Sequence, residues 1–352
     1  MNPSNRLVPL SCLAICLAST PAWLHSAPVS LKQRISSLQQ RAEAGDARAQ
    51  NDLAVRYDKG IGVDEDDLVA VKWYLRAARQ DLPEAQFNLG VMLSKGLGIP
   101  RDDQLALSWF LKAAKQGHIE ARFNAGKLMI AKASDPAEKQ EALTWIRKAA
   151  DAGVIEALLE LVDLHSSDPD LKSPGEAMSW LQKAAESGHA PSQYNLALAH
   201  EKGTAGPQNI PAAVLWYTRA AKQGLPSAHY NLAVLHMNVP TGAPDPHRAA
   251  YQAFRAAADK GHTKSQLQIG LMELKGQGTR RDAVNAARWF RLAADKGDAK
   301  AQYQLGWMRL YGIGLAEDAA LAVDWWTKAA ANGNETARAN LAQLKAQLAL
   351  PD

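Results

Sequence analysis

The chain has 352 residues, of which 47% are hydrophobic and 22% charged, and its net charge is +4. This composition excludes an intrinsically disordered chain, and so small a positive charge gives no support for nucleic-acid binding. Alanine is abundant while valine, isoleucine and threonine are sparse, which predicts a helical protein.

Residues 1–27 are predicted to be an export signal. An apolar stretch from Leu7 to Ala18 follows a single arginine, and small residues offer cleavage sites near 22 and near 27. The stretch is too short for a bilayer, which needs about 20 residues, and no later segment is long and apolar enough. Both cysteines, Cys12 and Cys16, lie inside the signal, so a mature chain would carry no disulfide. We expect a periplasmic or secreted protein without a transmembrane span.

A tryptophan recurs after this segment at gaps of 36, 36, 35, 36, 73 and 36 residues, and Ala253 holds the place skipped in the double step. An Ala-Ala pair follows four residues after each place, and a glycine follows the pair in seven of eight units, Asp81 being the exception. Self-similarity at this period indicates a stacked repeat protein. Phe254 is predicted to restore some of the volume of the absent indole. The tryptophans are Trp73, Trp109, Trp145, Trp180, Trp216, Trp289 and Trp325.

The second unit, Glu84–Gly117, shows the pattern most clearly. A helix around Leu89-Gly90 is expected to end at Gly96-Leu97-Gly98, because glycine tolerates positive φ. A second helix, capped by Asp102, carries Trp109 and ends at Gly117. Three further aspartates are expected to repeat the cap, namely Asp66, Asp282 and Asp318.

Different capping is expected in the fourth unit. Ser173 and Glu176 have the spacing of a capping box, and Pro174 stands at the first helical position. Outside the array, residues 28–45 are predicted to be an N-terminal capping helix, and residues 336–352 a C-terminal capping helix and tail. The eight units then occupy residues 46–335.

The spaced set Leu89, Gly90, Gly96, Gly98, Asp102, Trp109, Ala113 and Ala114 resembles the Sel-one-like (Sel1-like) repeat family, a relative of tetratricopeptide repeats. The resemblance covers about four fifths of the chain. It implies an all-α fold, a right-handed α-solenoid of about eight helix-turn-helix repeats of 35–37 residues, which acts as an adaptor in protein assemblies. Units three to six depart from the G-x-G pattern, and the cysteines of the disulfide-bearing branch of the family are absent.

The residue before the recurring leucine is polar in every unit, and the resemblance implies that this polar column lines a concave surface. An amide side chain both donates and accepts, so a row of amides suits an extended peptide backbone. The alternative interpretation is an ordinary solvated helix face. The predicted partner-binding residues are Asn88, Asn124, Asn195, Asn231, Gln268 and Gln304, beside Asp52 and Glu160 in the same column.

Aromatic residues stand near this column. Tyr194 and Tyr230 occupy the preceding position, where packing is the favoured interpretation and an edge exposed to the groove is the alternative. Trp307 lies two residues after Leu305 and is either an anchor for a partner or a plug against the C-terminal cap.

Three histidines, His165, His200 and His236, share one column at spacings of 35 and 36 residues. No metal site is expected there, because equivalent helices lie roughly 10 Å apart, too far for three rings to share one ion. Ring packing is the favoured role, and a pH-sensitive surface the alternative. The sequence leaves open the role of this column and of the degenerate units in residues 120–250.

No nucleophile, zinc-helix or phosphate-loop motif is present, so we expect no enzymatic activity and no cofactor. The favoured function is an exported adaptor that binds a peptide or protein partner in a concave groove. The alternatives are an architectural subunit of an envelope assembly and, less favoured, a cell-wall or β-lactam hydrolase. The partner, pathway, cleavage site and oligomeric state are not determined by the sequence.

Overall fold

The computed structural model describes residues 30–204 and 206–347, and the predicted export signal lies outside these residues. The described chain forms eighteen helices and no strand. This confirms the predicted all-α solenoid of about eight helical repeats. Contacts within the chain divide it into two units, residues 1–121 and residues 122–352, and each unit is described by itself.

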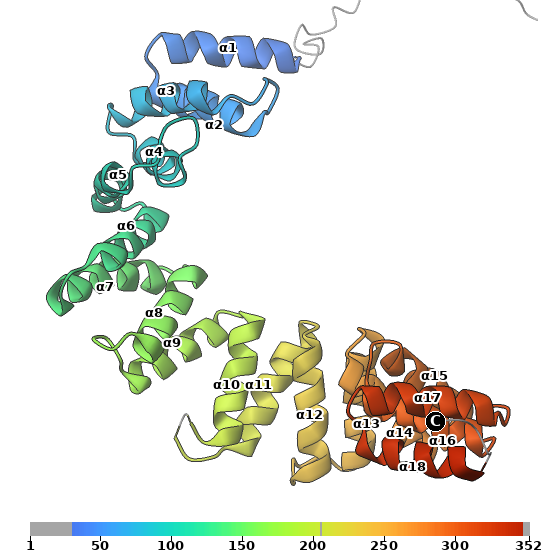
Figure 1. Cartoon of the computed structure of the whole chain (residues 1–352). Coiled ribbons are helices and arrows are strands. Elements are labelled where there is room, and N and C mark those ends of the chain that lie inside the picture. The colour runs from blue at the N-terminus through green and yellow to red at the C-terminus, as the bar shows by residue number, and fades with distance from the viewer. Residues whose placement is uncertain (1–29, 205, 348–352) are drawn as a thin grey trace, which may run out of the picture. The chain divides into compact units, whose positions relative to one another are not determined.

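Each repeat contributes two helices, which Figure 1 labels in chain order. The first helices are α2 (Ala47–Lys59), α4 (Pro83–Lys95), α6 (Ile119–Lys132), α8 (Ile155–Ser167), α10 (Ala190–Lys202), α12 (Pro226–Asn238), α14 (Thr263–Lys275) and α16 (Ala299–Leu310). The second helices are α3 (Asp67–Ala78), α5 (Asp103–Lys115), α7 (Pro136–Asp151), α9 (Pro174–Glu186), α11 (Ile210–Lys222), α13 (Pro246–Asp259), α15 (Ala283–Ala294) and α17 (Ala319–Ala331). Helix α1 (Leu31–Glu43) precedes them and α18 (Glu335–Gln347) follows.

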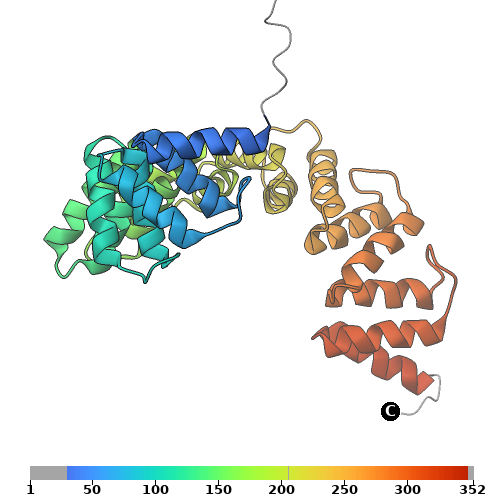
Figure 2. The same cartoon turned by 90° about the horizontal axis from the view of Figure 1, so that it is seen from above.

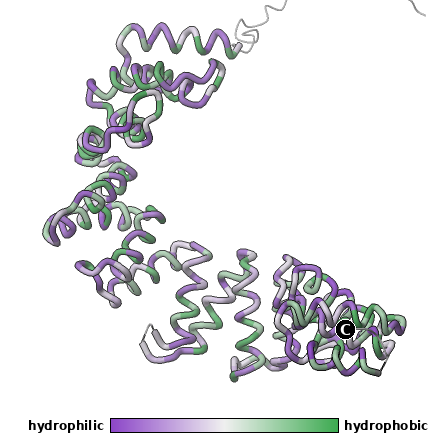
Figure 3. Tube along the Cα trace, in the orientation of Figure 1, coloured by the Kyte–Doolittle hydropathy of each residue, from purple (hydrophilic) through white to green (hydrophobic). Residues whose placement is uncertain are grey.

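Within residues 122–352, successive hairpins pack on one another, and Figure 2 shows this stacking clearly for α13 to α18. Both apolar and polar residues occur along the helices, as the mixed colours of the trace in Figure 3 show. One hairpin alone cannot cover its apolar stripe, and the next hairpin completes the burial.

The recurring tryptophan is not the deepest side chain of its helix. The residue after it is buried in all eight repeats, from Tyr217 and Phe290 at 0% exposed to Leu181 at 8%. Phe254 belongs to this second column, which a large side chain fills in every repeat, and it is 3% exposed beside Ala253. Adjacent helical positions point about 100° apart, and the second position faces the partner helix directly.

The glycine of the Leu-Gly pair provides room for that buried ring. A Cβ on Gly90 would lie 2.7 Å from Cε1 of Phe110, and a Cβ on Gly270 would lie 2.5 Å from Cε1 of Phe290. Such distances are below any van der Waals contact. The small residue on the first helix therefore fixes how closely the second helix approaches.

The two glycines of the G-x-G loop have different tasks. Gly96 ends α4 in the left-handed conformation, with φ of 71°. A Cβ on Gly98 would lie 2.5 Å from the carbonyl carbon of Asp67, the first residue of the preceding second helix. The second glycine thus lets the loop lie directly on the backbone of the previous repeat.

The aspartate caps form as predicted. Asp66, Asp102, Asp282 and Asp318 each accept a backbone N–H in the first turn of the following helix. The predicted capping box of the fourth unit does not form, because the Ser173 side chain makes no cap hydrogen bond. Its expected partner Glu176 accepts a hydrogen bond of 2.8 Å from Arg147 instead, and so it is directed away from the cap.

Candidate partner-binding face

Buried glutamine amides tie four of the first helices, α2, α4, α10 and α16, to the helix before each of them and to the end of the helix after it. Gln193 is 5% exposed and donates a hydrogen bond of 3.0 Å to the backbone oxygen of Ala185. Its own side-chain oxygen accepts a hydrogen bond of 2.8 Å from Gln223, thirty residues later. The same arrangement recurs for the pairs Gln50–Gln80, Gln86–Gln116 and Gln302–Asn332.

We name this the glutamine relay, and the sequence analysis missed it. The signal was present, because glutamine recurs three places before the leucine position at 50, 86, 193, 266 and 302. Where the relay is complete, its burial fixes the rotation of the first helix, and so it determines which side chains reach the outer surface of that helix.

Part of the polar column joins neighbouring repeats. Asn88 donates to Asn51 at 3.1 Å, and Asn231 donates to the hydroxyl groups of Tyr194 and Tyr217 at 3.1 and 3.0 Å. These predicted partner-binding amides are therefore occupied within the chain, and Asn124 also has an interaction of its own.

The other members of the column keep their amide groups available. Within the described residues, the side chains of Asn195, Gln268 and Gln304 have no hydrogen-bond partner in the chain. Asn195 is exposed, while Gln268 and Gln304 are half-buried on α14 and α16. The polar column is thus divided into members that join repeats and members that remain free to pair with a ligand.

Two adjoining hollows, of about 620 and 410 Å³, open over Gln268 and share it. The larger one is also lined by Leu267, Tyr303, Gln304 and the turn before α18. The smaller one is lined by Tyr230 and two exposed lysines, Lys264 and Lys300. We name this surface over α12, α14 and α16 the amide face, since its two free amides lie at its centre.

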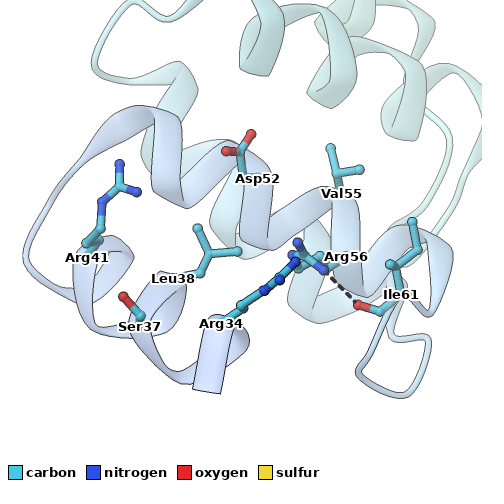
Figure 4. A pocket seen from close by; sticks show the side chains of 8 residues that line it. All are labelled: Arg34, Ser37, Leu38, Arg41, Asp52, Val55, Arg56 and Ile61. Carbon is cyan, nitrogen blue, oxygen red and sulfur yellow. Dashed lines mark hydrogen bonds between the residues drawn. The ribbon is translucent and has the colours of Figure 1, made fainter. Parts of the chain in front are cut away.

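The N-terminal part of the chain, up to residue 121, has a hollow of its own, of about 610 Å³, between α1 and α2. Figure 4 shows Arg34 of α1 extending toward Arg56 of α2, and Asp52 also belongs to the lining. Arg56 donates a hydrogen bond of 3.3 Å to the backbone oxygen of Ile61. Asp52 is the first member of the polar column. Members of this column therefore line hollows both before residue 121 and after residue 122.

The three aromatic candidates have different surroundings. The rings of Tyr194 and Tyr230 are half-buried, 5.6 Å from Tyr217 and 5.6 Å from Phe254 respectively. Of these two, Tyr230 also lines the amide face. Trp307 is half-buried and packs against core clusters on both of its sides, which favours the plug interpretation over the anchor.

The histidine column is not uniform. His165 is 2% exposed, and its Nδ1 donates to the backbone oxygen of Leu171 at 2.8 Å. His236 is half-buried, and its Nδ1 lies 2.6 Å from the hydroxyl of Thr241. Burial lowers the pKa of His236. Within residues 30–204 and 206–347, no group of three or more His, Cys, Asp or Glu side chains is placed to hold a metal ion.

A second feature missed from the sequence is the position of a cation over most of the tryptophans. A lysine or arginine three residues later lies 4.0–4.6 Å from the ring centre of Trp73, Trp109, Trp145, Trp180, Trp216 and Trp325. These contacts cover what remains exposed of the six indoles and stabilise their second helices through cation–π attraction. No helix in the described part of the chain is long and apolar enough to cross a membrane.

Comparison with known proteins agrees with this architecture. The Sel1 repeat pattern matches residues 47–82, 83–118, 120–154, 167–189, 190–225, 226–262, 263–298 and 299–334. A Sel1 repeat protein from Oxalobacter formigenes is 29% identical, with a TM-score of 0.63, over 88% of this chain and 90% of that one. A protective antigen of uropathogenic Escherichia coli with an SLR fold is 27% identical, with a TM-score of 0.52, over 90% and 75%.

No curated protein matches the chain closely enough to count as a relative. Sel1 repeat proteins generally mediate protein–protein interactions, and this type of scaffold is typically not an enzyme. The repeat pattern accounts for well over half of the residues, and the chain belongs to the Sel1 repeat family.

Proposed function

We propose that this protein is an exported scaffold that binds an extended segment of a partner protein on its amide face. The observation that carries the proposal is the pair Gln268 and Gln304. Both are held by rigid helices, both line the same hollow, and neither has a hydrogen-bond partner in the described chain. An unpaired amide can donate to a peptide carbonyl and accept from a peptide N–H.

The spacing suits a peptide backbone. Successive first helices lie roughly 10 Å apart in packed helices, and an extended chain rises about 3.3 Å per residue. Two amides one repeat apart therefore meet peptide groups about three residues apart. Leu267 and Tyr303 border the same hollow, so they offer apolar contacts to the side chains between those groups.

Photocrosslinking would test the position of the partner. We expect a photoreactive p-benzoylphenylalanine at position 304 to crosslink the partner in cells, while the same residue at exposed position 252 on α13 gives no adduct. The double variant Gln268→Ala/Gln304→Ala should weaken binding of the captured partner, and the matched double variant Gln104→Ala/Gln252→Ala should not. Crosslinks only from second helices would support the architectural alternative instead.

Export rests on the composition of residues 1–27 and is tested separately. Alkaline phosphatase without its own signal should become active when these residues are fused to its N-terminus. Leu13→Arg in the fusion should abolish that activity, because a charge interrupts the apolar stretch. Fractionation of cells into cytoplasm, periplasm, membrane and medium then separates a periplasmic protein from a secreted one.

A further inference from the structure

The second helix of the seventh repeat, α15, departs from the pattern of the others. Leu292 stands three residues after Trp289, at the place where six other repeats carry the lysine or arginine that covers their tryptophan. The Leu292 side chain is 47% exposed. Trp289 is covered instead by Arg255 of the preceding repeat, at 4.9 Å. An exposed leucine in place of a cation marks a local break in the repeat.

A cleft of about 410 Å³ opens beside this break, between α15, α16 and α17. Leu305 and Trp325 belong to its lining and are 2% and 8% exposed, whereas Val284 is 52% exposed. The apolar lining consists of Val284, Ala287, Leu292, Leu305, Leu315 and Trp325. Val284 and Leu292 therefore supply apolar surface that the fold itself does not cover, beside the buried Leu305 and Trp325.

Three arginines line the same cleft. Arg291 pairs with Asp295 at 2.9 Å and lies 5.1 Å from the ring centre of Trp325. Arg309 donates to the backbone oxygen of Ala316 at 3.1 Å, and Arg288 makes only a long contact of 3.4 Å with Asn285. Among the residues that the structure describes, Arg288 and Arg309 have no carboxylate partner within 4 Å.

We infer that this cleft, which we name the α15 cleft, binds a short acidic segment of a partner protein that carries an apolar side chain. The apolar side chain would enter between Leu292 and Trp325, where it is removed from water. Carboxylates on either side of it would pair with Arg288 and Arg309, because a guanidinium donates to a carboxylate in a two-pronged geometry. The charge of the arginines selects an acidic segment. Leu292 adds a requirement for an apolar side chain, which a purely ionic contact would not have.

The α15 cleft shares no lining residue with the amide face, so the inference stands apart from the proposed function. The two surfaces would give the scaffold a means of holding two segments at once, each with its own chemistry.

The test uses the full chain and a fluorescein-labelled peptide of sequence EDLFED, with fluorescence anisotropy as the readout. Leu292→Lys is the decisive variant, because it adds a positive charge and removes the apolar wall. We expect it to weaken binding at least about fivefold, since the loss of buried apolar contact outweighs a screened surface charge. Equal or tighter binding to Leu292→Lys would show a merely ionic contact and would overturn the inference.

Further variants and control peptides test the chemistry of the contact and the location of the binding site. The double variant Arg288→Glu/Arg309→Glu should lose binding, while Lys222→Glu, a single charge reversal at an exposed position of α11, should not. The peptides EDSSED and KKLFKK should bind at least about tenfold more weakly than EDLFED. Comparable affinity for either control peptide, or an equal loss in Lys222→Glu, would refute the α15 cleft as the site. The double variant Gln268→Ala/Gln304→Ala should leave EDLFED binding intact. A failure of the function proposed for the amide face can therefore be distinguished from a failure of the α15 cleft.

Discussion

The side chain of Gln223 donates a hydrogen bond of 2.8 Å to the side-chain oxygen of Gln193, and Gln193 donates to the backbone oxygen of Ala185 at 3.0 Å. The two glutamines lie thirty residues apart and join three helices of successive hairpins. Because Gln193 is 5% exposed, loss of this link leaves buried polar groups without partners.

We predict that Gln193→Ala lowers the free energy of unfolding by about 1–3 kcal/mol, the range for an orphaned buried hydrogen-bonding group. Urea denaturation followed by circular dichroism would measure it. In a double-mutant cycle, Gln193→Ala and Gln223→Ala should be less than additive, because either change alone breaks their shared bond. Full additivity of the two changes would contradict the relay.

The seventh repeat carries an incomplete relay that a single substitution should complete. Gln266 donates to the backbone oxygen of Ala258 at 3.2 Å, but its side-chain oxygen is buried without a partner. The place thirty residues later is occupied by Lys296, which donates to the backbone oxygen of Gly261. In the fifth repeat, Gln223 bonds both to Gln193 and to Gly188, the equivalent of Gly261.

We therefore predict that Lys296→Gln stabilises the protein by about 0.5–1.5 kcal/mol, because one glutamine amide can make both bonds. Lys296→Ala is the control, and it should stabilise nothing, since it removes the bond to Gly261 and supplies none to Gln266. A midpoint of denaturation no higher for Lys296→Gln than for the unaltered protein would count against this account.

The close approach of Gly270 to Phe290 gives a third prediction. Gly270→Ala should destabilise the fold by about 1–3 kcal/mol, because the new methyl group overlaps the ring and α14 must move from α15. Phe290→Leu added to Gly270→Ala should recover part of the loss by making room. Gly175→Ala on α9 is the matched control, since a Cβ there meets nothing within 4 Å. It should be neutral or gain up to about 1 kcal/mol from helix propensity.

The repeat, its helices and its aspartate caps could be predicted because each depends on local spacing. The relative depth of two adjacent large residues, such as Trp109 and Phe110, could not, because it depends on where the neighbouring helix lies. The same limit concealed the glutamine relay. In the sequence, Gln193 does not differ from other polar helix residues. Its role becomes apparent only when the backbone carbonyl of Ala185, near the end of α9, is known to lie beside it.

The candidate site was predicted in part. The polar column was recognised from its periodicity, but its division into structural and free members depends on side chains one repeat away, such as Tyr194 beneath Asn231. Leu292 was visible in the sequence as a departure from the lysines and arginines of other repeats. Its meaning required the neighbouring Arg309 and Trp325, which come from two other helices.

The last prediction concerns pH. Burial lowers the pKa values of His118, His229, His236 and His262 below the usual value for histidine. The neutral ring of His262 also caps α14 by accepting the backbone N–H of Ser265, which a protonated ring cannot do. The unfolded chain then binds more protons than the folded chain as pH falls below about 6.5. Stability from these groups is present above that pH and is lost on acidification.

We expect the free energy of unfolding to decrease between pH 7.5 and pH 5.5. The variant His262→Asn, which keeps a capping acceptor that does not titrate in this range, should show a smaller decrease. Burial raises the pKa of the Glu273 carboxyl, and this group acts in the opposite direction, because the folded chain then holds its proton more tightly. Glu273→Gln should therefore make the loss on acidification steeper. Urea titrations of the three proteins at several pH values would measure each slope, and a shallower slope for Glu273→Gln would exclude this assignment.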